Sequence, residues 1–285
     1  MGSVHEILFF KRIELHFMSI ITISRGSFSK GRDVAQQVAK RLNFEAVSRE
    51  VVIEASAEFN VSEIKLAHAI HDAPSVFERF TYGRQRYLAY LAAAILEHLQ
   101  KDNLVYHGLA GHFFVKNIAH VLKVRIIADF EDRIQTEMNR LGITRSAAIE
   151  LLKKDDIERR EWSRRIYGAD TGDPGLYDLV IHVRKLTVDD AVDIICRTVS
   201  REQFRTTPAS QRALDDLALA ARVRAAIVES YPNCTVSADG GAVLVHVNAA
   251  STLERRIVED ITCTAKEQQG VKTVRVHIVP TLLFE

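Results

Sequence analysis

The sequence predicts an α/β protein: a three-layer parallel sheet with helices on both faces, followed by a small C-terminal α+β domain. Over residues 20–200, short apolar runs rich in β-branched residues alternate with longer amphipathic runs, which is the pattern of parallel strands and crossover helices. The short runs show no polar alternation, as burial on both faces of a sheet requires. Beyond residue 200 the order becomes helix, two strands, helix and strand.

The sheet domain is expected over residues 19–200, after an N-terminal extension at residues 1–18. The extension has only one short apolar run, and the alternative is an edge strand or a short helix packed on the domain. Thr144 is a favourable helix N-cap and Gly168 a favourable stop, so they bound one long helix. Strands are expected at residues 20–24, 45–47, 104–107, 123–128 and 179–183, and helices at 32–42, 51–58, 84–100, 130–141, 145–167 and 188–200.

A polar stretch interrupted by Pro208 predicts a linker at residues 201–212. The domain after it, residues 213–285, has an αββαβ order. Its clearest signal is Asp239-Gly-Gly241 between two apolar runs, which predicts a tight β-hairpin. Helices are expected at residues 214–229 and 252–267, and strands at 235–238, 242–247 and 272–279.

The composition excludes several classes of protein. With 38 Lys and Arg against 37 Asp and Glu among 285 residues, the net charge is +1, so a nucleic-acid partner is not expected. The three cysteines form no Cys-x-x-Cys pair, which is typical of a reducing cytoplasm. No apolar run reaches the roughly 18 residues that a membrane-spanning helix needs. We therefore expect a cytoplasmic protein without transmembrane segments.

A candidate phosphate-binding loop joins the first strand to the first helix. Two glycines, Gly26 and Gly31, are separated by four residues, which lets backbone N–H groups turn towards phosphate oxygens at a helix N-terminus. Arg32 is the expected cation, and Asp33 is the expected ligand of a magnesium ion. The alternative is a tight turn in which Asp33 only favours the helix dipole. The full set of expected contacts is Gly26, Ser27, Ser29, Lys30, Gly31, Arg32 and Asp33.

Several segments, taken in order, resemble the cytidylate-kinase-like family of P-loop proteins. They are Ile20-Ile-Thr-Ile-Ser-Arg25 with Gly31-Arg-Asp-Val-Ala35, then residues 128–134, and then residues 168–180 with their Tyr-Asp-Leu-Val run. The resemblance covers residues 19–200. It implies a protein that binds ATP and Mg²⁺ and transfers a phosphoryl group to a nucleoside monophosphate such as CMP.

The same resemblance implies roles for residues outside the loop. The long helix at 145–167 stands where this family has its lid, and Arg160 and Arg164 are four residues apart, so they share a face. They would neutralise the transferring phosphoryl group, unless the helix is simply a solvated charged surface. Arg84 or Arg86 would contact the acceptor, with a surface basic cluster as the alternative. Ser48 stands where the family carries an acidic residue that meets the nucleoside.

Two other departures from the family pattern favour a second hypothesis. The loop contains the bulky Phe28, and Leu109 replaces an arginine of a Gly-Arg-Gly turn. These changes favour a catalytically degenerate, nucleotide-binding regulatory protein, and a purely structural protein is a third possibility. Residues 213–280 separately resemble a BON domain, which implies a lipid or protein partner for the C-terminal domain.

Overall fold

The computed structural model describes residues 18–25, 30–48, 83–108, 111–250 and 253–280. Three sequence predictions therefore lie outside the described residues: the extension up to residue 17, the helix at residues 51–58, and the phosphate loop from residue 26 to residue 29.

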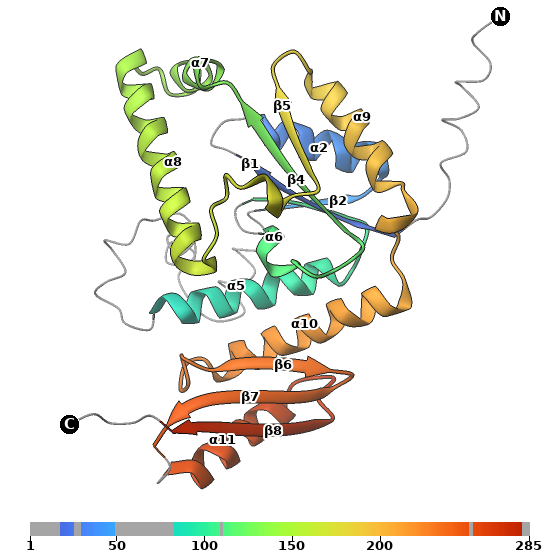
Figure 1. Cartoon of the computed structure of the whole chain (residues 1–285), viewed down its shortest axis with the longest axis vertical. Coiled ribbons are helices and arrows are strands. Elements are labelled where there is room, and N and C mark those ends of the chain that lie inside the picture. Colours follow the sequence, from blue (N-terminus) through green and yellow to red (C-terminus); the bar gives the residue numbers. More distant parts are fainter. Residues whose placement is uncertain (1–17, 26–29, 49–82, 109–110, 251–252, 281–285) are drawn as a thin grey trace, which may run out of the picture.

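A five-stranded parallel sheet forms the centre of the larger domain (Figure 1). Its order is β2-β3-β1-β4-β5, so β1 lies in the middle and pairs with both β3 and β4. Ile20 of β1 is buried against one face, whereas Ile21 and Ile23 belong to the core of the other face. The strands are β1 (Ile20–Arg25), β2 (Glu45–Val47), β3 (Leu104–His107), β4 (Val121–Ala128) and β5 (Leu179–Val183).

Helices cover both faces of this sheet. The apolar sides of α2 (Gly31–Leu42) and α9 (Val188–Val199) are buried against one face, and α5 (Gly83–Leu99) is buried against the other. Thr187 begins α9 with a capping box, because its hydroxyl accepts from the Asp190 N–H and the Asp190 carboxylate accepts from the Thr187 N–H. The other helices of this domain that the structure describes are α6 (Gly111–Phe114), α7 (Phe130–Leu141) and α8 (Arg145–Tyr167).

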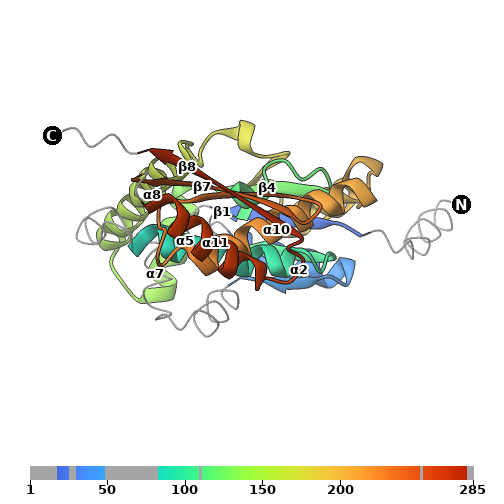
Figure 2. The same cartoon turned by 90° about the horizontal axis from the view of Figure 1, so that it is seen from below.

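The smaller C-terminal domain is a three-stranded sheet with two helices on one side of it (Figures 1 and 2). β6 and β7 are antiparallel, whereas β7 and β8 are parallel. Gly240 and Gly241 connect β6 to β7 with φ of 55° and 93°, the left-handed conformation that a two-residue hairpin turn needs. The elements are α10 (Pro208–Ile227), β6 (Thr235–Asp239), β7 (Ala242–Ala249), α11 (Glu254–Lys266) and β8 (Thr273–Pro280).

Helix α10 joins the two domains and has two buried faces. Leu214 and Ala218 belong to the core that contains α5, whereas Val223 and Ile227 belong to the core of the C-terminal sheet. The helix begins at Pro208, six residues before its predicted start, so its first residues fall within the predicted linker. A capping box at Thr207 and Ser210 explains the early start.

The predicted fold class is confirmed, and most boundaries differ from the predicted ones by no more than two residues. The caps of α8 are also as expected. Thr144 accepts a hydrogen bond from the Ala147 N–H, and Gly168 ends the helix with a φ of 64°. In the part of the chain that the structure describes, no helix has the length and apolar character that crossing a bilayer demands.

Candidate functional site

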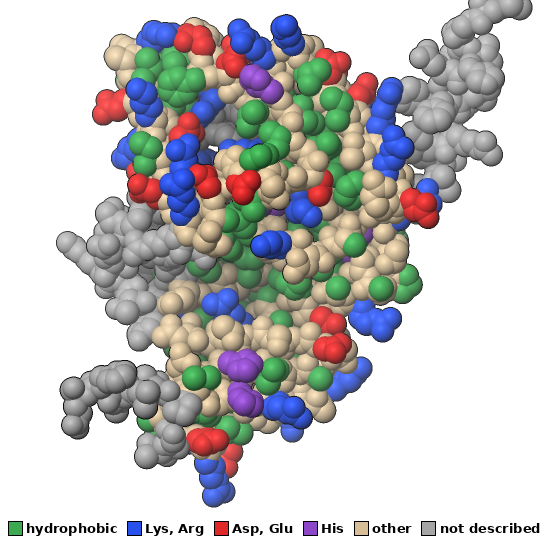
Figure 3. Space-filling model, viewed as in Figure 1, with side chains coloured by type: hydrophobic (Ala, Val, Ile, Leu, Met, Phe, Trp, Pro, Cys, Tyr) green, Lys and Arg blue, Asp and Glu red, His purple; other side chains and the backbone are tan. Residues whose placement is uncertain are grey.

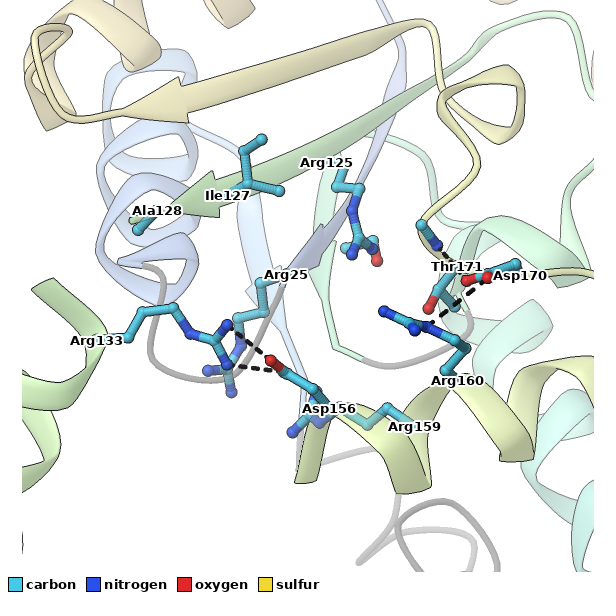
Figure 4. A pocket seen from close by; sticks show the side chains of 12 residues that line it. Arg25, Arg125, Ile127, Ala128, Arg133, Asp156, Arg159, Arg160, Asp170 and Thr171 are labelled. Carbon is cyan, nitrogen blue, oxygen red and sulfur yellow. Dashed lines mark hydrogen bonds and ion pairs between the residues drawn. The ribbon is translucent and has the colours of Figure 1, made fainter. Parts of the chain in front are cut away.

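A cleft of about 160 Å³ opens at the carboxyl ends of β1 and β4 (Figure 4). The chain leaves β1 towards β2 and leaves β4 towards β5, so the two connections diverge between these neighbouring strands. Ligands of open α/β sheets bind at such a switch point. The described residues of its lining are Ser24, Arg25, Arg125, Ile127, Ala128, Arg133, Asp156, Arg159, Arg160, Asp170, Thr171 and Gly172.

Arg25 is the last residue of β1 and lines this cleft. Gly31, at the start of α2, makes room for its side chain, because a Cβ atom at Gly31 would lie only 2.7 Å from Arg25 Cβ. Burial lowers the pKa of Arg25, and the positive charges of Arg159 and Arg32 lower it further. Among the described residues, no carboxylate forms an ion pair with Arg25. A half-buried guanidinium among like charges favours a bound anion.

The N-terminus of α2 also suits an anion. Lys30 holds the N-cap position with a φ of 60° and provides no side-chain hydrogen bond to the helix. Within the described residues, no side chain caps these N–H groups, and together with the positive end of the helix dipole they suit an anionic ligand near Arg25. Arg32 and Asp33 are exposed on this turn, and neither is among the described residues that line the cleft.

Arg125 enters the cleft from β4. Its Nη1 atom donates a hydrogen bond to the Tyr177 hydroxyl at 3.2 Å, and its guanidinium carbon lies 5.5 Å from the centre of that ring. The same hydroxyl donates to the Thr171 carbonyl at 3.0 Å and lies 3.3 Å from Ser24 Oγ. Like Arg25, Arg125 has no ion-paired carboxylate among the described residues.

The opposite wall comes from α7 and α8, where arginines are paired with acids. Arg133 donates from both terminal nitrogens to Asp156, at 2.8 and 2.7 Å (Figure 4). Arg159 donates from Nε to Asp155 at 3.2 Å, within one helical turn. These pairs hold two further guanidinium groups beside the cleft and fix their positions.

Arg160 and Arg164 both reach Asp170, from 3.7 and 2.7 Å respectively. The two arginines therefore lie on one face of α8, and Arg160 also lines the cleft. The Gly172 N–H, at 2.8 Å, and then the two arginines hold the pKa of Asp170 below its ordinary value. This contact ties the lid candidate to the segment that precedes β5.

Of the predicted acceptor residues, Ser48 and Arg86 are not among the described residues that line the cleft. Ser48 lies in a bend directly after β2 and is half buried. Arg84 lies in the first turn of α5, where its side chain is outside the described part of the structure. Arg86 instead binds the C-terminal domain: its Nη1 lies 3.0 Å from Glu229 Oε2, and its Nη2 donates to the Glu229 carbonyl at 3.0 Å. The packing of α10 on α5 brings Glu229 to this position.

Four cleft arginines were not predicted from the sequence: Arg25, Arg125, Arg133 and Arg159. A signal existed for two of them. Arg25 stands at the end of a buried strand, directly before the glycine-rich loop, and Arg125 interrupts the apolar run of β4. A charged residue in the carboxyl half of a central parallel strand points to a ligand, because burial otherwise disfavours it.

A model of the cytidylate kinase-like family matches residues 20–185, which is more than half of the chain. The chain belongs to this family. The match spans the sheet, the cleft and α8, so the protein has a kinase-like, nucleotide-binding fold. The cleft at the switch point is the corresponding candidate nucleotide site.

Among the proteins similar to parts of the chain are two curated proteins and a solved structure. A cytidylate kinase from Sulfolobus acidocaldarius is 28% identical over 106 residues, which are 37% of this chain and 58% of that protein. A uronate isomerase from Corynebacterium glutamicum is 28% identical over 101 residues, 35% of this chain and 20% of that protein. The chain thus spans less than two thirds of either relative. A crystal structure of an uncharacterized protein from Eubacterium ventriosum shares the fold, with a TM-score of 0.51, 22% identity, and coverage of 64% of this chain and 99% of that one.

The residues of the cleft fit a nucleotide polyphosphate. Five arginines and two aspartates line it, and both aspartates are already paired with arginines. For a magnesium ion, the fitting donor is Asp33, whose carboxylate has no ion-pair partner among the described residues and lies on the first turn of α2. Carboxylate and phosphate oxygens together are the ligands that Mg²⁺ takes in such sites.

Proposed function

We propose that this protein is a kinase that transfers the γ-phosphoryl group of ATP to a nucleoside monophosphate such as CMP. The observation that carries the proposal is the cleft itself: Arg25 and Arg125 enter it from two neighbouring strands, and among the described residues neither forms an ion pair with a carboxylate, although Asp155 and Asp33 lie close enough to favour the charge of Arg25. Such cations in a half-buried site match a ligand with several negative charges, and a nucleoside triphosphate is one.

Arg25 is the proposed main cation for the triphosphate, because Gly31 lets its side chain cross the first turn of α2. The N–H groups of that turn and the loop at residues 26–31 would bind phosphate oxygens. The interpretation that Arg32 grips the phosphates stays a prediction, since this side chain is exposed. When bound, Mg²⁺ would neutralise phosphate charge, and Asp33 is the residue that would hold it.

Helix α8 is the proposed lid. Arg160 and Arg164 extend from one face of it, and Arg160 already lines the cleft. Exchange of their shared Asp170 contact for the transferring phosphoryl group would place two positive charges where negative charge spreads in the transition state. Ser48 and Arg84 are the proposed acceptor contacts. No general base is needed, because a monophosphate oxygen is itself the nucleophile.

A second function has specific support: a nucleotide-binding regulatory protein without turnover. Arg86 is engaged by Glu229 of the C-terminal domain, and Leu109 and Phe28 depart from the family pattern. We also propose the division into a kinase-like domain up to residue 200 and a BON-like domain from residue 213. The BON-like domain would bind a lipid or protein partner, and the cytoplasm is the proposed location.

Two measurements test these functions. ATP with Mg²⁺ should raise the melting temperature, because a ligand at 100 times its Kd stabilises the native state by about 2.7 kcal/mol. A panel of nucleoside monophosphates should then show ADP formation that depends on one acceptor, with CMP expected first. Stabilisation by ATP without transfer to any acceptor would favour the regulatory function. Absence of stabilisation would refute the nucleotide site and with it both functions.

A further inference from the structure

Among the described elements, no helix packs on one face of the C-terminal sheet. Helices α10 and α11 pack on the face formed by Val243, Val245, Val274 and Val276, and the residues between these valines point to the other side. On the uncovered face, Thr235, His246 and His277 are all exposed and lie in one row across β6, β7 and β8. The cleft and the proposed kinase function involve none of these residues.

The two histidines face each other across parallel strands. His246 and His277 are paired in the register of β7 and β8, and their ring centroids lie 5.5 Å apart with a 45° angle between the planes. Figure 3 shows two histidine side chains side by side on this face of the smaller domain. With metal–nitrogen bonds of about 2.0–2.1 Å, two imidazoles on one tetrahedral ion hold their ring centroids roughly 5 Å apart. The observed spacing is therefore close to that of two imidazoles on one ion.

We propose that His246 and His277 form a two-histidine site for a divalent late first-row transition metal, with Zn²⁺, Ni²⁺ and Cu²⁺ as the chemical class. The two imidazoles supply two nitrogen ligands, and water completes the coordination. Within the described ranges, no group of three or more His, Cys, Asp or Glu could hold a metal, so this site has only two protein ligands. Imidazole ligands and the Irving–Williams order predict the tightest binding for Cu²⁺, whereas Mg²⁺ and Ca²⁺ should not bind here.

The surrounding charge sets the strength of the site. Arg275 lies two residues before His277 on the same strand and the same exposed face, about 7 Å away along the strand. Its positive charge repels a divalent cation in proportion to both charges, and salt weakens this effect. Removal of this charge should therefore tighten metal binding several-fold at low ionic strength.

Calorimetric titration of the metal-free full chain with ZnCl₂ and with NiCl₂ tests the proposal. The chain has 11 histidines, so the informative quantity is the difference between variants. His246→Ala and His277→Ala should each remove one binding event or weaken it at least tenfold, because one imidazole cannot chelate. Both positions are exposed, so the variants should fold. His182→Ala is the matched control, since His182 is exposed but bound to Asp129, and it should retain the event.

Two further readouts separate this site from nonspecific binding. Arg275→Gln should tighten Zn²⁺ binding several-fold, and acidification from pH 7.5 to 5.5 should weaken it, because imidazole binds metal only in its neutral form. Equal stoichiometry and affinity in the native protein and in both histidine variants would overturn the proposal. The proposal would also be overturned if His182→Ala removed the metal-binding event and His246→Ala retained it.

Discussion

Replacement of Arg25 by methionine should separate ligand binding from stability. Methionine keeps an unbranched side chain that fits over Gly31 but removes the guanidinium. In the unliganded protein this charge is disfavoured, because burial, Arg159 and Arg32 all lower the pKa of Arg25. Arg25→Met should therefore leave the free energy of unfolding unchanged or raise it by about 0.5–2 kcal/mol. Replacement of a ligand-binding residue that is unfavourable in the unliganded protein commonly stabilises the fold by this amount.

The same substitution should weaken ATP binding strongly. A hydrogen bond to a charged group contributes about 1.5–3 kcal/mol, which corresponds to about a 10–150-fold rise in Kd. Arg32→Met is the matched control, because Arg32 is another arginine close to the cleft and lies on the first turn of α2. Because Arg32 is exposed, its replacement should change stability by less than about 0.5 kcal/mol and should change Kd much less than Arg25→Met does.

Urea denaturation without ligand and calorimetric titration with ATP and Mg²⁺ measure both quantities on the same three proteins. Arg25→Met should be at least as stable as the native protein but should bind ATP at least tenfold more weakly. A stability loss above about 1 kcal/mol with unchanged ATP affinity would show that Arg25 is a structural residue. A larger affinity loss in Arg32→Met than in Arg25→Met would restore Arg32 as the main cation.

Three other predictions follow from the lid, the helix shared by both domains, and a buried histidine. Arg160→Ala and Arg164→Ala should each lower kcat by about 100-fold but keep an ATP affinity within about threefold of the native value, because the two arginines act on the charge of the transition state. An unchanged kcat in both variants would rule out the lid role. Leu214→Ala removes a fully buried side chain between α10 and α5 and should lower the free energy of unfolding by about 2–5 kcal/mol. Urea denaturation of this variant should show one transition for the whole chain, whereas two transitions would mean that the domains unfold independently. Burial, then Arg125 and Lys123, lowers the pKa of His112 to about 3, so the unfolded chain binds a proton that the native state rejects. Stability should therefore rise with pH between about 3 and 6.5 by up to about 1.4 kcal/mol per unit, and His112→Phe should reduce that pH dependence. The same difference in free energy of unfolding between pH 5 and pH 7 in the native protein and in His112→Phe, measured by urea denaturation, would contradict this.

The fold could be predicted because its determinants are local. The alternation of Ile20, Ile21 and Ile23 between two cores follows from the period of a strand, and Thr144 and Gly168 mark the ends of α8 by their own backbone chemistry. The hairpin at Gly240 and Gly241 is equally local. These signals do not depend on residues far away in the chain.

The site could be predicted only in part, because its charges meet through tertiary contacts. Arg160 and Arg164 share a face by spacing alone, but their common partner, Asp170, became visible only in the structure. Arg86 was assigned to an acceptor, and its actual partner, Glu229, lies 143 residues further along the chain. Arg25 follows the predicted strand at residues 20–24 and received no role from the sequence, and its place in the cleft depends on the missing Cβ of Gly31.

The double role of α10 has a consequence for synthesis of the protein. One side of α5 is covered in the folded chain by α10, as the hydrogen bonds from Tyr90 to Glu229 and from Gln100 to Asp215 show. The ribosome makes α10 only after the whole kinase-like domain. At about 5–20 residues per second, the stretch from the end of α9 to the end of α10 takes roughly 1–6 s to translate. During this interval the sheet and its first helices can form while one apolar side of α5 faces water. The nascent chain is therefore most exposed to aggregation, and most in need of a chaperone, just before its second sheet emerges.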